Sequence, residues 1–374
     1  MCKHWLKLNR LFLLIALGFS SIAQGMPQFN MTRGVTPISH DIFHLHMTIF
    51  WICTAIAVVV FGVMFIAILK HRKSQGHQAS HFHESTAVEI IWTIIPFLIL
   101  IAMAIPATKV LIRLEDAKNP DINIKVTGIQ WKWQYDYIDE GFSFISNLKT
   151  PEEEIKNLKP KNPNYLLEVD NEVVVPINKK IRFLTTAQDV IHSWWVPALG
   201  VKKDSIPGFI NETWALIEEP GVYRGQCAEL CGRNHGFMPI VVRAVSETEY
   251  AEWVAQQLAQ KADNEALSGK TLTLEELMQK GEEVYKVQCV ACHQTTGQGL
   301  PGVFPALKNS PVATGDITKH IDIVLNGVNG TAMQAFGKML NDYEIAAVVT
   351  YERNAWGNNT GNIVQPMDIQ AARK

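Results

Sequence analysis

The sequence has no excess of charge of either sign. Its 34 Lys and Arg residues nearly balance its 36 Asp and Glu residues, and the formal net charge is −2. A strong basic excess is the usual mark of a nucleic-acid-binding surface, so this balance implies no nucleic-acid partner. The chain of 374 residues is long enough for two or three domains.

Charge is missing altogether from two long apolar runs, residues 47–69 and 90–108. Helix rises about 1.5 Å per residue, so the first run reaches roughly 35 Å and can cross a bilayer. We therefore predict a transmembrane hairpin in residues 26–115, with spans at about 44–69 and 88–110.

Residues 1–25 are typical of a signal peptide. They combine a basic start, a short apolar stretch at Leu11–Phe19 and small residues before position 26. The alternative is a first membrane helix, but nine apolar residues are too few to cross about 30 Å. The basic loop Lys70–Lys73 should stay cytoplasmic, which places both termini on the outer side of a bacterial inner membrane.

Two other features of the hairpin are weaker indications of a functional site. His71, His77, His81 and His83 lie in the loop between the spans, where a metal site is conceivable and a solvated loop is the simpler reading. Glu89 begins the second span. It is either an ordinary carboxylate at a helix N-terminus or a functional group at the membrane border.

Cysteine is scarce, with six residues in the whole chain. Cys2 lies in the predicted signal peptide and Cys53 in an apolar run. The other four form two close pairs, Cys-x3-Cys at 227 and 231 and Cys-x-x-Cys at 289 and 292. A disulfide is the simplest alternative for such a pair in an exported domain, so the neighbouring residues must decide.

The first pair belongs to a cluster of soft and borderline metal ligands. Cys227, Cys231, His235 and Met238 fall within twelve residues, and His192 lies 35 residues upstream of Cys227. This set exceeds the four ligands of a structural zinc site and favours copper. Two thiolates four residues apart can share two metal ions, so we predict a copper centre that transfers electrons.

Residues 116–246 show short apolar alternations broken by Pro, Gly and Asn, which predicts a small β-sandwich or barrel. The expected strands are 122–127, 129–137, 172–175, 181–186, 213–217 and 238–245. Within 129–137 the aromatic residues at 131, 133, 135 and 137 should share one face, and Lys132, Gln134 and Asp136 the other. Such a stripe usually faces the core, although an aromatic at the strand end could contact a partner.

The motifs Gly-Ile-Gln-Trp131-Lys-Trp133-Gln-Tyr135, His192-Ser-Trp-Trp and Cys227-x-Glu229-x-Cys231-x3-His235-x2-Met238 follow paired spans. Over residues 40–245 the chain resembles subunit II of the haem-copper cytochrome c oxidases. The resemblance implies a cupredoxin-like domain with a dinuclear copper centre, CuA.

The same resemblance implies a role for each matching residue. Cys227 and Cys231 would bridge the coppers, His192 and His235 would each bind one copper, and Met238 and the carbonyl of Glu229 would be weak ligands. The Glu229 side chain would help to hold magnesium at subunit I. Trp131 matches the tryptophan through which electrons arrive, and Glu89 matches the glutamate at the mouth of a proton channel in subunit I.

The second cysteine pair belongs to Cys289-Val-Ala-Cys292-His293, the attachment sequence of c-type haem. A redox dithiol is the alternative. The second axial ligand must come from further along the chain, from Met333 in a Gly-rich loop or from Met339. We favour Met333, and a His/Met pair gives a relatively high potential.

The surrounding sequence predicts helices by its capping boxes. Ser246 should cap a helix from 247 to about 262, and Thr273 and Asn341 should cap two more, with a polar linker around 262–270. Residues 274–357 resemble an all-α class I cytochrome c domain, with Gly281 and Tyr285 on its first helix and Tyr351 on its last. The family usually has Pro after the ligand Met, where this chain has Gln334.

The sequence thus predicts a multidomain chain: signal peptide 1–25, hairpin 26–115, copper domain 116–246, helix and linker 247–273, cytochrome domain 274–357 and tail 358–374. It resembles the electron-accepting subunit of a proton-pumping, caa-type oxidase, with subunits I and III and an external cytochrome c-like donor as partners. The alternatives are the CuA subunit of a nitric oxide reductase and a non-enzymatic copper carrier or redox sensor.

Overall fold

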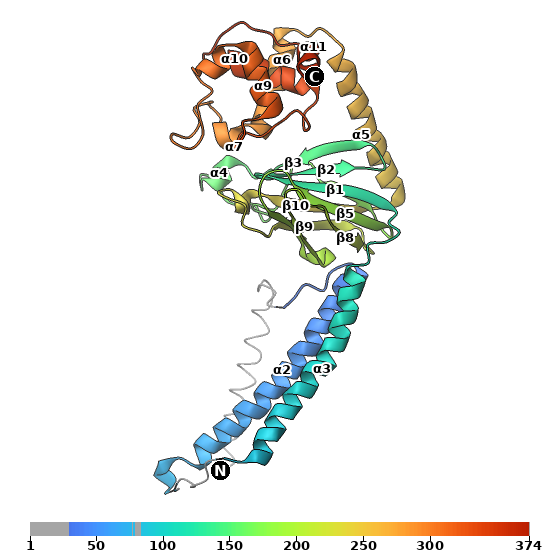
Figure 1. Cartoon of the computed structure of the whole chain (residues 1–374), viewed down its shortest axis with the longest axis vertical. Helices are drawn as coiled ribbons and strands as arrows, with labels where there is room; N and C mark the ends of the chain where they lie inside the picture. The colour runs from blue at the N-terminus through green and yellow to red at the C-terminus, as the bar shows by residue number, and fades with distance from the viewer. Residues whose placement is uncertain (1–29, 77, 79–83, 374) are drawn as a thin grey trace, which may run out of the picture. The chain divides into compact units, whose positions relative to one another are not determined.

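The computed structural model describes residues 30–76, 78 and 84–373 (Figure 1). They divide into two compact units, the first holding residues 39–110 and the second holding 35–38 and the chain from Leu111 onward. The predicted signal peptide and three histidines of the loop between the spans (His77, His81 and His83) lie outside the described residues.

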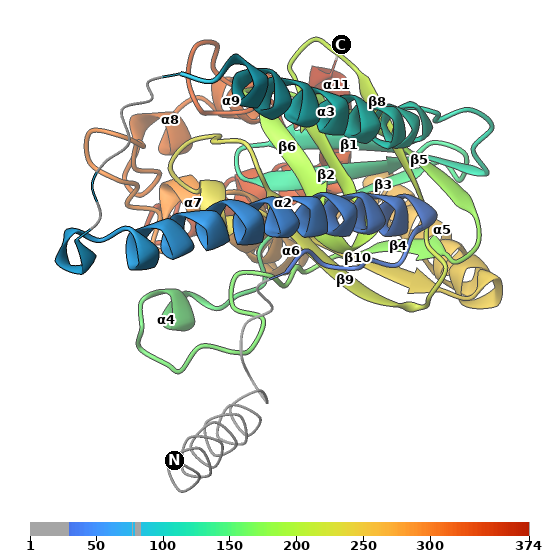
Figure 2. The same ribbon diagram turned by 90° about the horizontal axis from the view of Figure 1, so that it is seen from below.

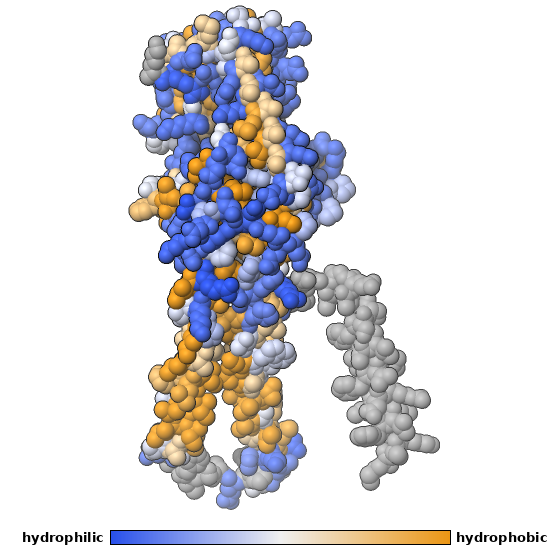
Figure 3. Space-filling model, turned by 90° about the vertical axis from the view of Figure 1, so that its right-hand side faces the viewer, coloured by the Kyte–Doolittle hydropathy of each residue, from blue (hydrophilic) through white to orange (hydrophobic). Residues whose placement is uncertain are grey.

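Two long helices make up most of the first unit, α2 (Pro37–Lys70) and α3 (Thr86–Leu114), with a short 3-10 turn η1 (Lys73–Gln75) between them. Both are long and apolar enough to cross a membrane, and their surfaces are strongly hydrophobic (Figure 3). Each helix continues beyond the predicted span, because backbone hydrogen bonds propagate without regard to side-chain polarity. Pro96 and Pro106 are accommodated inside α3.

The second unit begins with two five-stranded sheets that form a sandwich. The first sheet has the order β3-β2-β1-β5-β8, and its strands are Ile122–Ile129 (β1), Lys132–Tyr137 (β2), Phe142–Ser146 (β3), Lys180–Ala187 (β5) and Asn211–Leu216 (β8). The second has the order β4-β10-β9-β6-β7, and its strands are Val173–Pro176 (β4), His192–Val196 (β6), Val201–Ser205 (β7), Gly221–Cys227 (β9) and Pro239–Val245 (β10). Burial alternates along β1 and β5, as expected for strands with one face on a core.

Three shorter elements complete this part of the unit: α4 (Glu152–Ile155), η2 (Pro197–Leu199) and η3 (His235–Phe237). The segment that carries α4 loops away from the sheets (Figure 2). The hydrophobic core of the sandwich includes Trp133, Phe183, Trp194 and Ile240, all fully buried.

The predicted strand 129–137 is wrong near its start. Gln130 and Trp131 form the turn between β1 and β2, so Trp131 lies off the strand and only half-buried. The other three aromatics of the stripe face the core as predicted. Lys132, predicted on the solvent face, is only 5% exposed.

Helix α5 (Glu247–Ser268) follows the sandwich and starts at the predicted capping box of Ser246 and Glu249. It runs about six residues past the predicted end, so the first part of the predicted linker is helical. Leu267, in that extension, packs against the core of the C-terminal helices. This tertiary contact stabilises helix where the polar sequence alone suggested a linker.

The C-terminal part is helical, with elements α6 (Leu274–Gln288), α7 (Val290–His293), α8 (Pro311–Thr314), α9 (Ile317–Asn326), α10 (Asp342–Asn354) and α11 (Pro366–Ala372). Capping boxes at Thr273 and Asn341 start α6 and α10, as predicted. The two helices cross at Gly281, where an added Cβ would lie 2.2 Å from the carbonyl oxygen of Ala347. Only glycine permits this approach.

Candidate metal centre

The predicted copper ligands come from neighbouring strand ends of one sheet. His192 is the first residue of β6, and Cys227 is the last residue of β9, the strand that pairs with β6. The loop from Cys227 to Met238 then returns to β10. A hydrogen bond from Cys227 N–H to the Met238 carbonyl oxygen (3.0 Å) closes this loop at its base.

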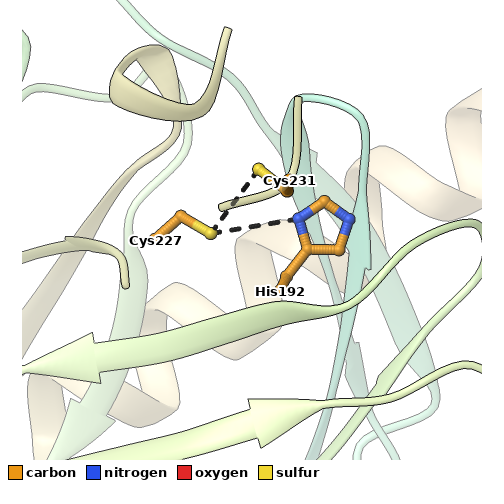
Figure 4. Close-up of side chains that lie close together, drawn as sticks. All are labelled: His192, Cys227 and Cys231. Carbon is orange, nitrogen blue, oxygen red and sulfur yellow. Dashed lines mark hydrogen bonds between the residues drawn. The ribbon is translucent and has the colours of Figure 1, made fainter. Parts of the chain in front are cut away.

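The side chains of His192, Cys227 and Cys231 converge (Figure 4). The two sulfurs of Cys227 and Cys231 are 3.8 Å apart, and Cys227 Sγ is 3.9 Å from His192 Nδ1. His235 Nδ1 lies 3.5 Å from Cys231 Sγ on the other side of the pair. Each sulfur therefore has one imidazole nitrogen beside it, as a site for two metal ions requires.

Of the two weaker predicted ligands, the Glu229 carbonyl contacts the pair and Met238 shares its hydrophobic core. The backbone carbonyl oxygen of Glu229 accepts a hydrogen bond from Cys227 Sγ at 3.4 Å, while the Glu229 side chain is exposed. Met238 is buried in the same core cluster as both cysteines. No disulfide joins the cysteines, which are free and buried.

Asp189 fixes the orientation of His192, and the sequence analysis missed it. Its Oδ1 accepts a hydrogen bond from His192 Nε2 at 2.9 Å, which leaves Nδ1 directed at the sulfurs. Carboxylates commonly orient metal-binding histidines in this way. A carboxylate three residues before a predicted histidine ligand was the signal that could have revealed it.

Proton sharing links these groups. The hydrogen bond with Cys231, followed by that with His192, lowers the pKa of the Cys227 thiol although burial opposes ionisation. The same bond with Cys227 and burial raise the pKa of Cys231. Burial opposes protonation of His192, but hydrogen bonds to Asp189 and Cys227 outweigh it and raise its pKa. Metal binding would have to displace the shared proton.

Gly128 is a second residue that sequence reasoning missed. A Cβ at this position would lie 2.7 Å from Cδ2 and 2.8 Å from Cγ of His192. The His192 ring is fully buried and also contacts the Trp133 ring edge-on, at 5.9 Å between centroids. The ring therefore rests directly on the backbone of β1.

Trp131 contacts the ligand loop. Its indole Nε1–H donates to the carbonyl oxygen of Cys231 at 3.2 Å, and Gln130 Nε2 donates to the same oxygen at 2.8 Å. Gly232, with φ +113°, lies under the indole, and its added Cβ would be 3.2 Å from Trp131 Cζ2. The turn predicted to receive electrons is thus hydrogen-bonded to a predicted copper ligand.

The haem-attachment sequence lies at the end of α6 and in α7. His293 is buried, and its Nδ1 bonds the carbonyl oxygen of Pro305 at 2.9 Å. A carbonyl can only accept, so Nδ1 carries the proton and Nε2 has its lone pair free for iron. The donor set therefore fits a covalently attached haem with a histidine ligand.

Met333 and Met339 both pack beside the core of the helical part. Met339 lines a cleft of about 940 Å³, to which Cys289, Cys292 and His293 contribute nothing. Met333 does not line this cleft. Its loop is held by the Val328 N–H bond to the Met333 carbonyl oxygen (2.9 Å). The choice of Met333 over Met339 as the second axial ligand therefore stays a prediction from the sequence.

Two other features weighed in the sequence belong to the first unit. Glu89 lies in the first turn of α3. His71 follows α2, and the described residues show no histidine cluster around it.

The fold and this geometry define a class of protein: a β-sandwich domain with a soft-ligand metal site, preceded by two apolar helices and followed by a haem-binding type of helical domain. Three family descriptions match the chain. They are cytochrome c oxidase subunit II, transmembrane domain (residues 25–110), the periplasmic domain of the same subunit (122–245) and cbb3-type cytochrome c oxidase subunit III (276–351).

Individual proteins agree with these matches. The probable cytochrome c oxidase subunit 2 of Rickettsia conorii is 42% identical over 236 residues, which cover 63% of this chain and 72% of that protein. The subunit 2 of Arabidopsis thaliana is 40% identical and is matched over 90% of its length and 62% of this chain. A crystal structure of the periplasmic domain of subunit II of Bradyrhizobium japonicum cytochrome oxidase is 46% identical, with a TM-score of 0.35, covering 38% of this chain and 98% of that one.

This chain belongs to the cytochrome c oxidase subunit II family, and it carries a cytochrome c domain fused at its C-terminal end.

Proposed function

We propose that this chain delivers electrons within a proton-pumping cytochrome c oxidase. Cys289, Cys292 and His293 would hold a c-type haem able to accept electrons from an external cytochrome c-like donor. The cysteine and histidine ligands of the copper domain would hold a dinuclear CuA centre able to relay those electrons to the haem-copper site of subunit I, where oxygen would be reduced to water. The observation that carries this proposal is the arrangement of Cys227, Cys231, His192 and His235, with one imidazole nitrogen beside each sulfur.

When bound, the two copper ions and the haem supply one-electron carriers. The role of this chain is to hold the metal-binding side chains in fixed positions. Cys227 and Cys231 would bridge the metal ions, His192 and His235 would each bind one, and the Glu229 carbonyl and Met238 would complete the set. Rigid strand ends and the Asp189 hydrogen bond limit ligand movement when charge arrives.

The helical domain would hold its haem through Cys289 and Cys292, with His293 and Met333 as axial ligands. The Pro305 carbonyl keeps the His293 ring in one tautomer and one orientation. Trp131 would accept the electron, since its indole is hydrogen-bonded to Cys231.

The contacts with other subunits follow from resemblance and exposure. The exposed Glu229 side chain would share a magnesium ion with subunit I, and Glu89 would stand at the mouth of a proton channel there. Leu230, next to Glu229, is 79% exposed. Subunit III would complete the complex. The two spans would cross the bacterial inner membrane, with both termini and both cofactor domains on its outer side.

The test is metal and haem quantitation with electron paramagnetic resonance on the full-length chain in detergent. We expect two coppers that share one unpaired electron, together with one covalently bound haem. A single zinc ion, or a disulfide between Cys227 and Cys231, would refute the proposal. The full chain is needed because Val35, which precedes α2, packs on the sandwich core.

Electron transfer between haem and copper should depend only weakly on salt. Residues 116–246 carry 17 acidic and 15 basic residues, a difference of 2. A tethered domain meets its acceptor at an effective concentration on the order of millimolar, so charge steering is not needed. No described ion pair joins residues 116–246 to residues 274–373. Flash-induced kinetics at rising ionic strength would measure this, and a steep fall in rate would contradict it.

A further inference from the structure

The residue after the predicted haem ligand Met333 reaches the copper-binding domain. Gln334 Nε2 donates to the backbone carbonyl oxygen of Gln130 at 3.0 Å and lies 3.4 Å from Asp189 Oδ2. The same Asp189 oxygen accepts the Gln130 backbone N–H at 2.7 Å, and its other oxygen holds His192. One carboxylate thus contacts both the cytochrome domain and a predicted copper ligand.

We propose that Gln334 is a positioning residue that docks the cytochrome domain on the turn between β1 and β2, through Gln130 and Asp189. The inference rests on the proposed function, because it gives the contact through which the two redox domains face each other. From Met333, the connection to His192 crosses only two hydrogen bonds, Gln334 to Asp189 and Asp189 to His192.

A second contact supports the same docking surface. Lys132, the residue after Trp131, donates from Nζ to Gln288 Oε1 at 2.6 Å, and its ammonium lies 5.0 Å from the centroid of the Phe336 ring. Gln288 directly precedes Cys289, and Phe336 follows Gln334 by two residues. The two segments that flank the predicted haem site therefore meet the copper domain at one turn. Burial in this contact lowers the pKa of Lys132 to about 8.

The chemistry explains why a carboxamide suits this position. Gln334 faces a carbonyl oxygen and a carboxylate, both acceptors, so only a donor is stabilising there. Its own oxygen is buried without a hydrogen-bond partner in the structure, which shows that the amide nitrogen makes the polar contacts. Glutamate at this position would set a second carboxylate against Asp189, and leucine would remove the donor that the Gln130 carbonyl oxygen accepts.

The test compares the full-length, metal-loaded chain with Gln334→Glu, Gln334→Leu and Gln334→Lys. Gln279→Glu is the matched control, because Gln279 is an exposed carboxamide on α6. Hydrogen–deuterium exchange is followed in the segments 128–133 and 188–192. Gln334→Glu should speed exchange about tenfold, equivalent to about 1.4 kcal/mol of weakened docking. Gln334→Leu should act in the same direction, while Gln334→Lys, which keeps a donor, and the control should stay near wild type.

The rate at which one electron passes from reduced haem to oxidised copper should fall in Gln334→Glu and Gln334→Leu. It should stay near wild type in Gln334→Lys and in Gln279→Glu. Unchanged exchange in Gln334→Glu, or equal loss of protection in Gln279→Glu, would overturn the docking role. Failure of the proposed function is distinguishable from this. In that case the wild-type chain itself would lack the copper signal or the covalent haem, whereas failure of the docking role alone leaves both present.

Discussion

Replacing Gly128 with alanine should weaken copper binding by about 10- to 100-fold, the range found when groups that orient metal ligands are removed. The added methyl group would lie 2.7 Å from the His192 ring, well inside van der Waals contact. The ring has nowhere to retreat, because it is fully buried between Trp133 and Asp189. It can relieve the clash only by leaving its position beside Cys227.

Copper titration and the electron paramagnetic resonance signal of the full-length chain would measure this loss. Gly236→Ala is the matched control, because Gly236 lies in the same ligand loop and an added Cβ there has nothing within 4 Å. Thermal unfolding of the metal-free chains should show Gly128→Ala destabilised relative to the control by about 1–3 kcal/mol, and copper titration is carried out below the unfolding temperature of both variants. If Gly128→Ala binds both coppers as tightly as the control, the support of His192 by β1 plays no part in the site.

The sequence could predict the ligand residues because ligand chemistry is local. Cys227, Cys231, His235 and Met238 lie within one loop, and their spacing alone restricts the metals they can bind. The groups that orient those ligands are not local in this sense. Gly128 contacts His192 only because β1 packs against β6. The sequence around position 128 gives no indication of that packing.

The strands that sequence reasoning missed show a related limit. β6 is buried along four of its five residues, so the alternation that marks a half-buried strand is absent. β7, Val201-Lys-Lys-Asp-Ser205, is polar enough to pass for a loop, yet it pairs with β6 along its whole length. Both β6 and β7 form because they pair with neighbouring strands, and the local sequence gives no sign of that pairing.

Trp131 has a different local structure from the one predicted, while its role in electron entry stays a prediction. Period-two spacing placed it on a strand with Trp133, whereas it forms the turn before that strand. The turn is what frees the indole to bond the Cys231 carbonyl oxygen, since a strand position would have directed it into the core. The contact of Gln334 with Gln130 could not be predicted from local sequence either, because folding brings together two residues that are 204 positions apart.

Replacing Met333 with leucine should lower the reduction potential of the haem by an amount on the order of hundreds of millivolts, since the choice of axial ligands spans about 0.8 V. Leucine matches methionine in size but has no lone pair, so the packing of the loop is retained while the ligand is lost. The oxidised absorption spectrum should shift for the same reason. Redox titration followed by visible absorption would measure both effects.

Met339→Leu is the matched control, because Met339 lines the cleft that Cys289, Cys292 and His293 do not reach. It should leave potential and spectrum near wild type. The reverse result, with Met339→Leu disruptive and Met333→Leu silent, would transfer the axial role to Met339. That outcome would also remove the short connection from the haem ligand through Gln334 to His192, because Gln334 adjoins Met333 and not Met339. The two substitutions therefore test the haem ligand and the route to the copper centre together.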